Sequence, residues 1–278
     1  MRLSTWWVVV LACFVGAMVV RVTVPRIWTT PLPTKSDSLR GELPGDSLDA
    51  VHHPTSFRPQ QRLADVLLRL GRAVDAEVPA RRAVALAPRQ ASAHATLGEV
   101  LASELKFAPA IDELTDAMRR GAHDRMTYGA LAWSYVMTRQ DSAASRTYTE
   151  ALSRGYDDPT LLSGYAMFLI SKGRPNAMAY AEHVVALAPN WAPAHAILSK
   201  AFAARSDAHH AREHMQRATE LYPGFWGYWA DLGDYAFLDG DTAAAWSAFS
   251  RARALDSARF DAMPSWHAMW TTANAAHR

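Results

Sequence analysis

Cysteine is almost absent from this chain. Cys13 is the only one among 278 residues, and it lies in a hydrophobic N-terminal segment. The rest of the chain therefore forms no internal disulfide, and packing alone has to stabilise it. The sequence also lacks a paired-cysteine motif for haem or iron–sulfur ligation, a glycine-rich phosphate loop and a nucleophile elbow. We therefore expect no cofactor, no catalytic residue and no enzymatic activity.

An excess of one charge is also missing. The chain has 29 Lys and Arg against 27 Asp and Glu, which gives a net charge of only +2. Nucleic-acid binding requires a clustered basic stripe that neutralises phosphates. The arginines here alternate with acidic residues along the chain, which is typical of a solvated helical surface. We expect no nucleic-acid partner.

The N-terminus is the one long apolar run. No charged residue occurs between Arg2 and Arg21, and residues 6–20 are almost wholly apolar. A helix rises about 1.5 Å per residue, so this segment is long enough to span a bilayer core. We predict a transmembrane signal anchor over residues 1–24, with the lipid bilayer as its partner.

Two other interpretations of this segment stay open. A cleaved secretory signal peptide needs small residues before its cleavage site, and residues 15–17 supply them. A lipoprotein signal would use Cys13, but the apolar run continues past it. Basic residues flank the segment on both sides, so orientation is poorly determined. We expect a single-pass protein of a bacterial inner membrane whose domain after residue 56 lies in the periplasm. The alternative is that this domain lies in the cytoplasm.

Residues 25–56 begin with Pro25 and carry four more prolines, at positions 31, 33, 44 and 54, among Ser, Thr, Asp and Gly, without a sustained helical period. This composition predicts a Pro-rich extended linker between the membrane and the rest of the chain. A strap that lies along a partner is the alternative.

Small residues recur every 34 positions after this linker, in three series of six members each. The series are Ala64, Gly98, Ala132, Ala166, Ser199 and Gly233; Ala76, Ala110, Ala144, Ala177, Ala211 and Ala245; and Ala83, Ala117, Ala151, Val184, Ala218 and Ala252. Each series contains a single interval of 33 residues instead of 34. The three short intervals share only residues 166–177, which contain the turn around residues 172–176. One deletion in that turn explains all three shifts. A period of this length is typical of a helix-turn-helix solenoid.

Further residues complete the pattern. A large residue and a Leu-Gly pair occur as His94, Leu97 and Gly98 and as Trp229, Leu232 and Gly233, followed in the last unit by Ala245, Phe249 and Ala252. A proline closes three units, at Pro88, Pro189 and Pro223, whereas Ala122, Tyr156 and Ser257 replace it elsewhere. In these residues the chain resembles the tetratricopeptide repeat (TPR) family, of the membrane-anchored bacterial type.

The resemblance implies an all-α solenoid of about six repeats, preceded by the transmembrane helix. The units are 57–90, 91–124, 125–158, 159–191, 192–225 and 226–259. Residues 260–278 then form a capping helix, with Trp266 and Trp270 on its apolar stripe, because a solenoid has to cover the exposed end of its core.

In the family, certain first-helix positions face a ligand in a concave groove. Transferred to this chain, they give a protein-binding groove of Trp133, Val136, Met137, Met167, Ile170, Lys200, Phe237 and Leu238. The same position holds Asp65 and Glu99 in the first two units, so the front of the array is acidic and its middle apolar. We expect the middle to take an amphipathic helix or an extended apolar segment. The alternative is that these side chains are core between repeats.

Two other groups of residues are candidates. Trp191, Phe225 and Trp226 lie in turns and are interface aromatics if exposed, although they equally fit a role in covering gaps between helix pairs. His210 and His214 lie one helical turn apart, with His209 adjacent and Glu213 as the nearest further ligand. Zinc requires three or four ligands, so this run favours a solvated surface over a metal site.

The favoured function is a membrane-anchored TPR scaffold that acts by protein–protein interaction as an accessory or assembly subunit of a larger membrane-protein complex. The resemblance implies roles in respiratory, photosynthetic or envelope-biogenesis assemblies and does not choose among them. The alternative is a soluble exported peptide-binding adaptor, released by signal cleavage. A metal-binding module is the third class.

Overall fold

The computed structural model describes residues 36–277, and every regular element in that range is a helix. The predicted membrane anchor at 1–24 lies outside the described residues. Within 36–277, no helix combines the length and the apolar character that crossing a bilayer demands. The chain divides into two compact units at Tyr165 and Ala166, inside α9. We call the described parts, 36–165 and 166–277, the first and the second unit, and describe each by itself.

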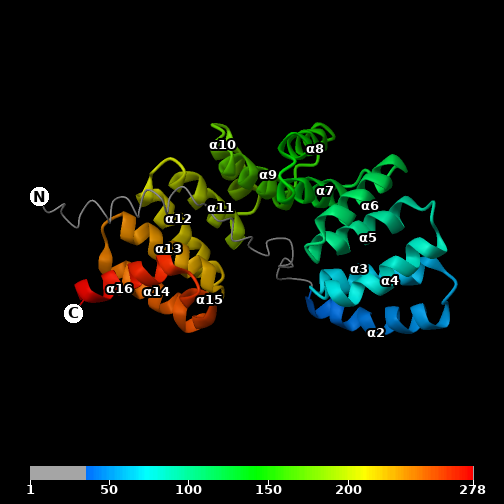
Figure 1. Cartoon of the computed structure of the whole chain (residues 1–278), viewed down its shortest axis with the longest axis horizontal. Coiled ribbons are helices and arrows are strands. Elements are labelled where there is room, and N and C mark those ends of the chain that lie inside the picture. The colour runs from blue at the N-terminus through cyan, green and yellow to red at the C-terminus, as the bar shows by residue number, and fades with distance from the viewer. Residues whose placement is uncertain (1–35, 278) are drawn as a thin grey trace, which may run out of the picture. The chain divides into compact units, whose positions relative to one another are not determined.

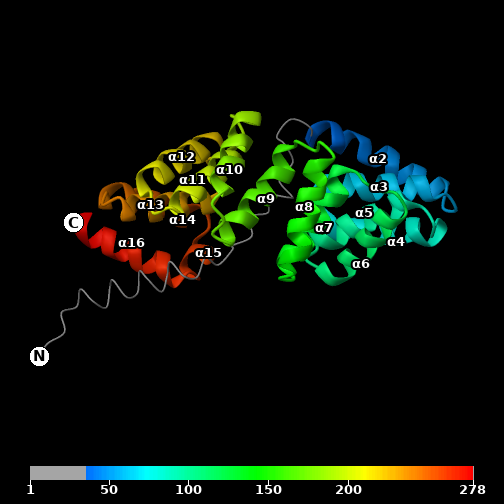
Figure 2. The same cartoon turned by 90° about the horizontal axis from the view of Figure 1, so that it is seen from above.

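Helix hairpins build both units (Figures 1 and 2). The first unit contains α2 (Ser36–His52), α3 (Phe57–Arg69), α4 (Ala73–Leu86), α5 (Ala91–Ser103), α6 (Phe107–Arg119), α7 (Arg125–Met137), α8 (Asp141–Ser153) and the start of α9 (Pro159–Ser171). The second contains the end of α9, α10 (Ala177–Leu187), α11 (Ala192–Ala203), α12 (Ala208–Leu221), α13 (Trp226–Leu238), α14 (Thr242–Leu255), α15 (Ser257–Asp261) and α16 (Pro264–His277). Each repeat's first helix begins at the residue where the 34-residue period places a new unit.

The small-residue series mark the closest helix crossings, and all of their members are buried. A Cβ added at Gly98 would lie 2.5 Å from Leu114 Cγ, and one added at Gly233 would lie 2.5 Å from Phe249 Cδ1. Leu114 and Phe249 each follow their glycine by 16 residues and are fully buried. The two units therefore contain the same tight crossing between the first and second helix of a repeat.

The turn within each hairpin has one residue in the left-handed region. These residues are Gly71, Leu105, Arg139, Gly173, Ser206 and Gly240. The next residue then donates its backbone N–H to the carbonyl five positions earlier, as Lys106 does to Leu101 O at 2.9 Å. Only three of the six are glycine, so the sequence does not reveal this position by residue type.

The missing residue shortens one helix. Ala177 is the first residue of α10, whereas the equivalent Ala110 and Ala211 lie three residues inside α6 and α12. The deletion at 172–176 therefore removes the first turn of the second helix in this repeat.

Two of the three repeats that lack the closing proline, those with Ala122 and Tyr156, use a glycine turn instead. Gly121 and Gly155 adopt φ values of 100° and 82°, in the left-handed region. Asp124 then caps α7 by accepting from the backbone N–H groups of Met126 and Thr127 at 2.9 and 3.0 Å. Asp158 caps α9 in the same way. These turns are therefore as sharply defined as the proline turns.

The expectation of an extended linker over 25–56 is wrong for residues 36–52, which form α2. This helix packs along α3, and Gln60 Nε2 donates to Ala50 O at 2.8 Å. Arg62 forms ion pairs with Asp49 and Asp46, and Leu43 packs on the core. Because α2 has no amphipathic period and contains Pro44, its sequence does not predict a helix. Contacts with α3 stabilise it.

The C-terminal end of the second unit is covered by two helices, α15 and α16, over the range where one was expected. Phe260, Trp266 and Ala273 are buried against Phe249 and its neighbours. Arg253 holds Asp261 through two hydrogen bonds of 2.8 and 3.0 Å. This pair fixes the short α15 between α14 and α16.

Candidate functional site

The first unit contains an open cleft of about 780 Å³. Its walls come from α3, α5 and the turn before α7, with Phe57 and Ala91 on one side and Met126 on the other. We call it the α3–α5–α7 groove. Its size lies within the range of pockets that hold small ligands or peptide side chains, about 300–1,000 Å³.

A hydrogen-bond network holds the floor of the groove. Gln61 of α3 donates to Ser92 O and Thr96 Oγ1 of α5, both at 3.3 Å. Ser92 returns a hydrogen bond to Gln61 Oε1 at 3.1 Å. Since the network joins two consecutive repeats, it holds the lining side chains in place before any ligand arrives.

Three carboxyl groups line the groove: Asp65 from the first repeat, and Glu99 and Asp124 from the second. Asp65 pairs with Arg69 at 3.5 Å, and Asp124 is occupied as the cap of α7. Burial raises the pKa of Glu99 to about 8, and the negative charges of Asp124 and Asp65 add to the increase. Glu99 is therefore mostly protonated at neutral pH, in contrast to an ordinary surface carboxylate.

Two arginines also reach the groove. Arg62 is already paired with Asp49 and Asp46 of α2. Arg58 lies at the rim, with its guanidinium 5.9 Å from the centre of the Phe57 ring. The charge nearest Glu99 therefore comes from carboxylates.

None of the eight residues predicted for the groove lines this cleft. Trp133, Val136 and Met137 are half-buried on α7 of the first unit. In the second unit, Met167 and Ile170 pack against the core around Ala166 and Ile197. These two side chains fit the alternative in which the predicted groove residues are core between repeats.

The remaining predicted groove residues differ from one another. Lys200 forms an ion pair with Asp231 at 2.6 Å. Burial alone would lower the pKa of Lys200, but the charge of Asp231 outweighs it and raises that pKa. Phe237 packs in the C-terminal core, and Leu238 is 64% exposed.

Asp234 follows Gly233 as Glu99 follows Gly98. Burial and the charge of Asp231 raise the pKa of Asp234 to about 8. Trp266 of α16 donates its indole N–H to Asp234 at 2.7 Å. Asp234 therefore has a hydrogen-bond partner on the C-terminal helix.

The turn aromatics are packed. Trp191 is only 9% exposed. Phe225 meets Tyr228 edge-on at 4.8 Å, and Trp226 meets Trp266 edge-on at 5.4 Å. The contacts of Phe225 and Trp226 favour gap covering within the second unit, and an interface role for the three stays a prediction.

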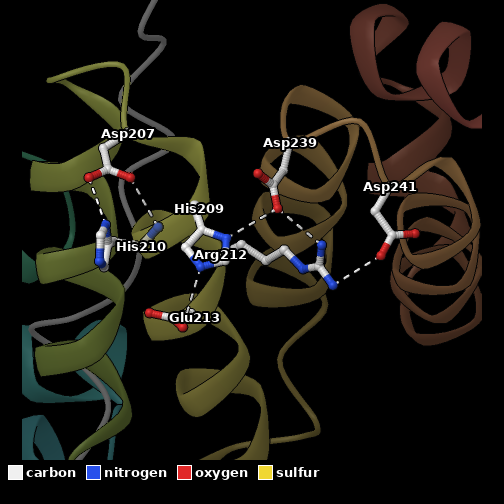
Figure 3. Close-up of polar contacts among 7 residues, drawn as sticks. All are labelled: Asp207, His209, His210, Arg212, Glu213, Asp239 and Asp241. Atoms are coloured by element: carbon white, nitrogen blue, oxygen red, sulfur yellow. Dashed lines mark hydrogen bonds and ion pairs between the residues drawn. The ribbon is translucent and has the colours of Figure 1, made fainter.

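The histidine run faces several separate partners (Figure 3). His209 lies 3.6 Å from Asp239 and 3.7 Å from Glu213, whereas His210 Nδ1 is 2.7 Å from Asp207. In the part of the chain that the structure describes, no group of three or more His, Cys, Asp or Glu residues is placed to hold a metal ion.

One polar feature escaped the sequence analysis. The large residue at the fourth position of a repeat donates to the carbonyl of the preceding proline: His94 to Pro88 at 3.0 Å, His195 to Pro189 at 2.9 Å and Trp229 to Pro223 at 2.8 Å. We call each such bond a proline clasp. The signal was available, because each donor follows its proline by six residues.

Comparison with known proteins shows the fold. No protein-family model matches the sequence, and no curated protein matches it significantly. Among solved structures, a chain of the APC/C hetero-tetramer Cut9–Hcn1 is 16% identical with a TM-score of 0.75, covering 86% of this chain and 47% of its own. This chain therefore spans about half the length of that one.

Two further solved structures have a similar fold. A tetratricopeptide repeat protein from Parabacteroides merdae is 9% identical with a TM-score of 0.62, covering 86% of this chain and 90% of its own. Pseudomonas aeruginosa pilF is 18% identical with a TM-score of 0.60, covering 73% and 92%. The chain thus has the all-α, TPR-like fold that the repeat pattern predicted.

Proposed function

We propose that this protein is a non-enzymatic scaffold whose α3–α5–α7 groove holds a segment of a partner protein. The observation that carries the proposal is the open cleft, which has a pre-formed polar floor and apolar walls. Repeat proteins stack their units into extended binding surfaces. The solved TPR structures of similar fold support a surface of this kind.

The proposal extends to the location of the protein. Residues 1–24 anchor it in a bacterial inner membrane, with the repeats in the periplasm, and it serves as an accessory or assembly subunit of a membrane-protein complex. The apolar composition of residues 6–20 supports the anchor. Carbonate extraction of membranes, with mass determination of the full chain, tests it. Release of a chain shortened at its N-terminus would favour the exported adaptor instead.

Site-specific crosslinking tests the groove. A photoreactive residue replaces Met126, which lines the groove and is 44% exposed, and the matched control replaces Leu187 of α10, which is 41% exposed. We expect crosslinks from position 126 to one defined segment of one partner in intact cells. Equal yields from both positions would contradict binding in the groove.

A further inference from the structure

We propose that the α3–α5–α7 groove selects a partner segment that carries a lysine or arginine between apolar residues, with the cation placed against Glu99. This inference rests on the groove being a protein-binding site and adds the chemistry of its occupant. Three properties of the groove lead to it.

The first property is charge. Asp65 comes from the first repeat and Glu99 and Asp124 come from the second, so an occupant that lies across the two repeats meets all three. An acidic side chain there would be repelled, whereas a cation is attracted. Arg62 offers little compensation, because Asp49 already pairs with it.

The second property is the state of Glu99. Asp65 pairs with Arg69, and Asp124 caps α7, so both of those carboxylates have partners inside the protein. The nearby acidic groups favour the neutral form of Glu99. A ligand cation would place a positive charge beside Glu99, where the nearest charged groups are carboxylates, and Glu99 would ionise against it, releasing a proton.

The third property is the wall. Phe57, Ala91, Ala95 and Met126 present apolar surface around the carboxyl groups. Apolar side chains that flank the cation are therefore covered together with it, and the groove distinguishes such a segment from a purely basic one.

Peptide pools test the inference on the full chain in detergent. Four random nine-residue pools carry Lys, Arg, Gln or Glu at the centre, and binding is measured by competition with one labelled pool member. We expect the Lys and Arg pools to bind about tenfold tighter than the Gln pool, and the Glu pool to bind weakest. Glu99→Gln keeps the size of the side chain and should abolish this preference.

The matched control is Asp112→Asn, which removes the same charge from the exposed face of α6 in the same unit. It should leave the preference intact. If all pools bind equally to the unaltered chain, or if Glu99→Gln retains the Lys preference, the inference is overturned while the groove remains a binding site. If no pool binds, both the inference and the proposed function fail.

Proton release gives an independent measurement. Titration calorimetry of one Lys-centred peptide in two buffers with different ionisation enthalpies should show nearly one proton released per complex at pH 7, and none for Glu99→Gln. Affinity should rise about tenfold between pH 6.5 and 7.5 and level off above pH 8. Binding of the Lys-centred peptide without proton release would contradict a cation against Glu99.

Discussion

The first and second units contain the same proline clasp with different second partners. His94 donates to Pro88, and its Nδ1 lies 2.6 Å from a carboxylate oxygen of Glu113. His195 donates to Pro189, but its Nδ1 lies 3.3 Å from Nδ1 of His214. Glu113 and His214 each follow their histidine by 19 residues, so the scaffold position is the same.

The two clasps differ in the kind of group beside the second ring nitrogen. Both partners of His94 are oxygens that accept hydrogen bonds. The two rings in the second unit share one hydrogen between their Nδ1 atoms, so they suit the neutral pair. Burial lowers the pKa of His214, the charges of His195 and His210 lower it further, and Glu213 opposes them. The same fold therefore places a carboxylate beside one clasp and a second imidazole beside the other.

The largest expected effect concerns the tight helix crossing that both units contain. Gly98→Val and Gly233→Val should each destabilise their unit by about 3 kcal/mol, because the added Cβ alone would lie 2.5 Å from a buried side chain. Urea unfolding followed by circular dichroism measures the loss. Gly224→Ala, where nothing lies within 4 Å of the added Cβ, is the control. A much smaller loss in one unit would show that the crossings differ.

Removing a proline clasp should lower the free energy of unfolding by less than filling a tight crossing does. His94→Ala and His195→Ala each leave a proline carbonyl without its donor, and we expect a loss of about 1–3 kcal/mol at pH 7.5. Hydrogen exchange resolved by peptide assigns the loss to α5 and α6 or to α11 and α12. Changes confined to other helices would contradict a stabilising role for the clasps.

Lowering the pH should affect the two clasps differently. The folded pKa of His214 is lowered, so the unfolded state binds more protons at this residue below about pH 6.5, and the stability that this site contributes to α11 and α12 falls as pH falls from 7.5 to 5.5. Asp234 of α13, whose folded pKa is raised to about 8, acts in the opposite direction on the second unit as a whole, so the comparison is made within α11 and α12. Hydrogen exchange should accelerate in α11 and α12 more than in α5 and α6.

Exchanging the residues beside His94 and His195 tests whether these residues cause the difference between the two units. His214→Glu places in the second unit the carboxylate that His94 meets in the first, so the loss between pH 7.5 and 5.5 should shrink. Glu113→His should introduce a loss in the first unit. If His214→Glu leaves the acid sensitivity unchanged, another group is responsible for it.

The smallest effect concerns the hairpin turns. Leu105 and Ser206 adopt φ values of 63° and 61°, which glycine reaches without strain. Leu105→Gly and Ser206→Gly should each stabilise their unit by about 0.5 kcal/mol, as measured by urea unfolding. The control Val78→Gly, on the exposed face of α4, should destabilise the first unit by a similar amount.

Particular residues show what the sequence could predict. The repeat register follows from steric limits at residues such as Gly98 and Gly233, and those limits are visible as a period. Helix α2 has no period, so only its contacts with α3 reveal it. The resemblance to the TPR family indicates which positions face a groove. It does not indicate where the side chains leave an open cleft. Met167 packs into the core, whereas the small Ala95 and Ser92 leave a cleft.

The glycine turns also have a consequence for the growth of the array. Residues 125–158 follow one such turn and end in another, and Asp158 caps α9 as Asp124 caps α7. A tandem copy of this segment would place Asp158 directly before a second Arg125, in the role that Asp124 has now. Unequal recombination can therefore lengthen the protein at this point without any compensating substitution at the new joint.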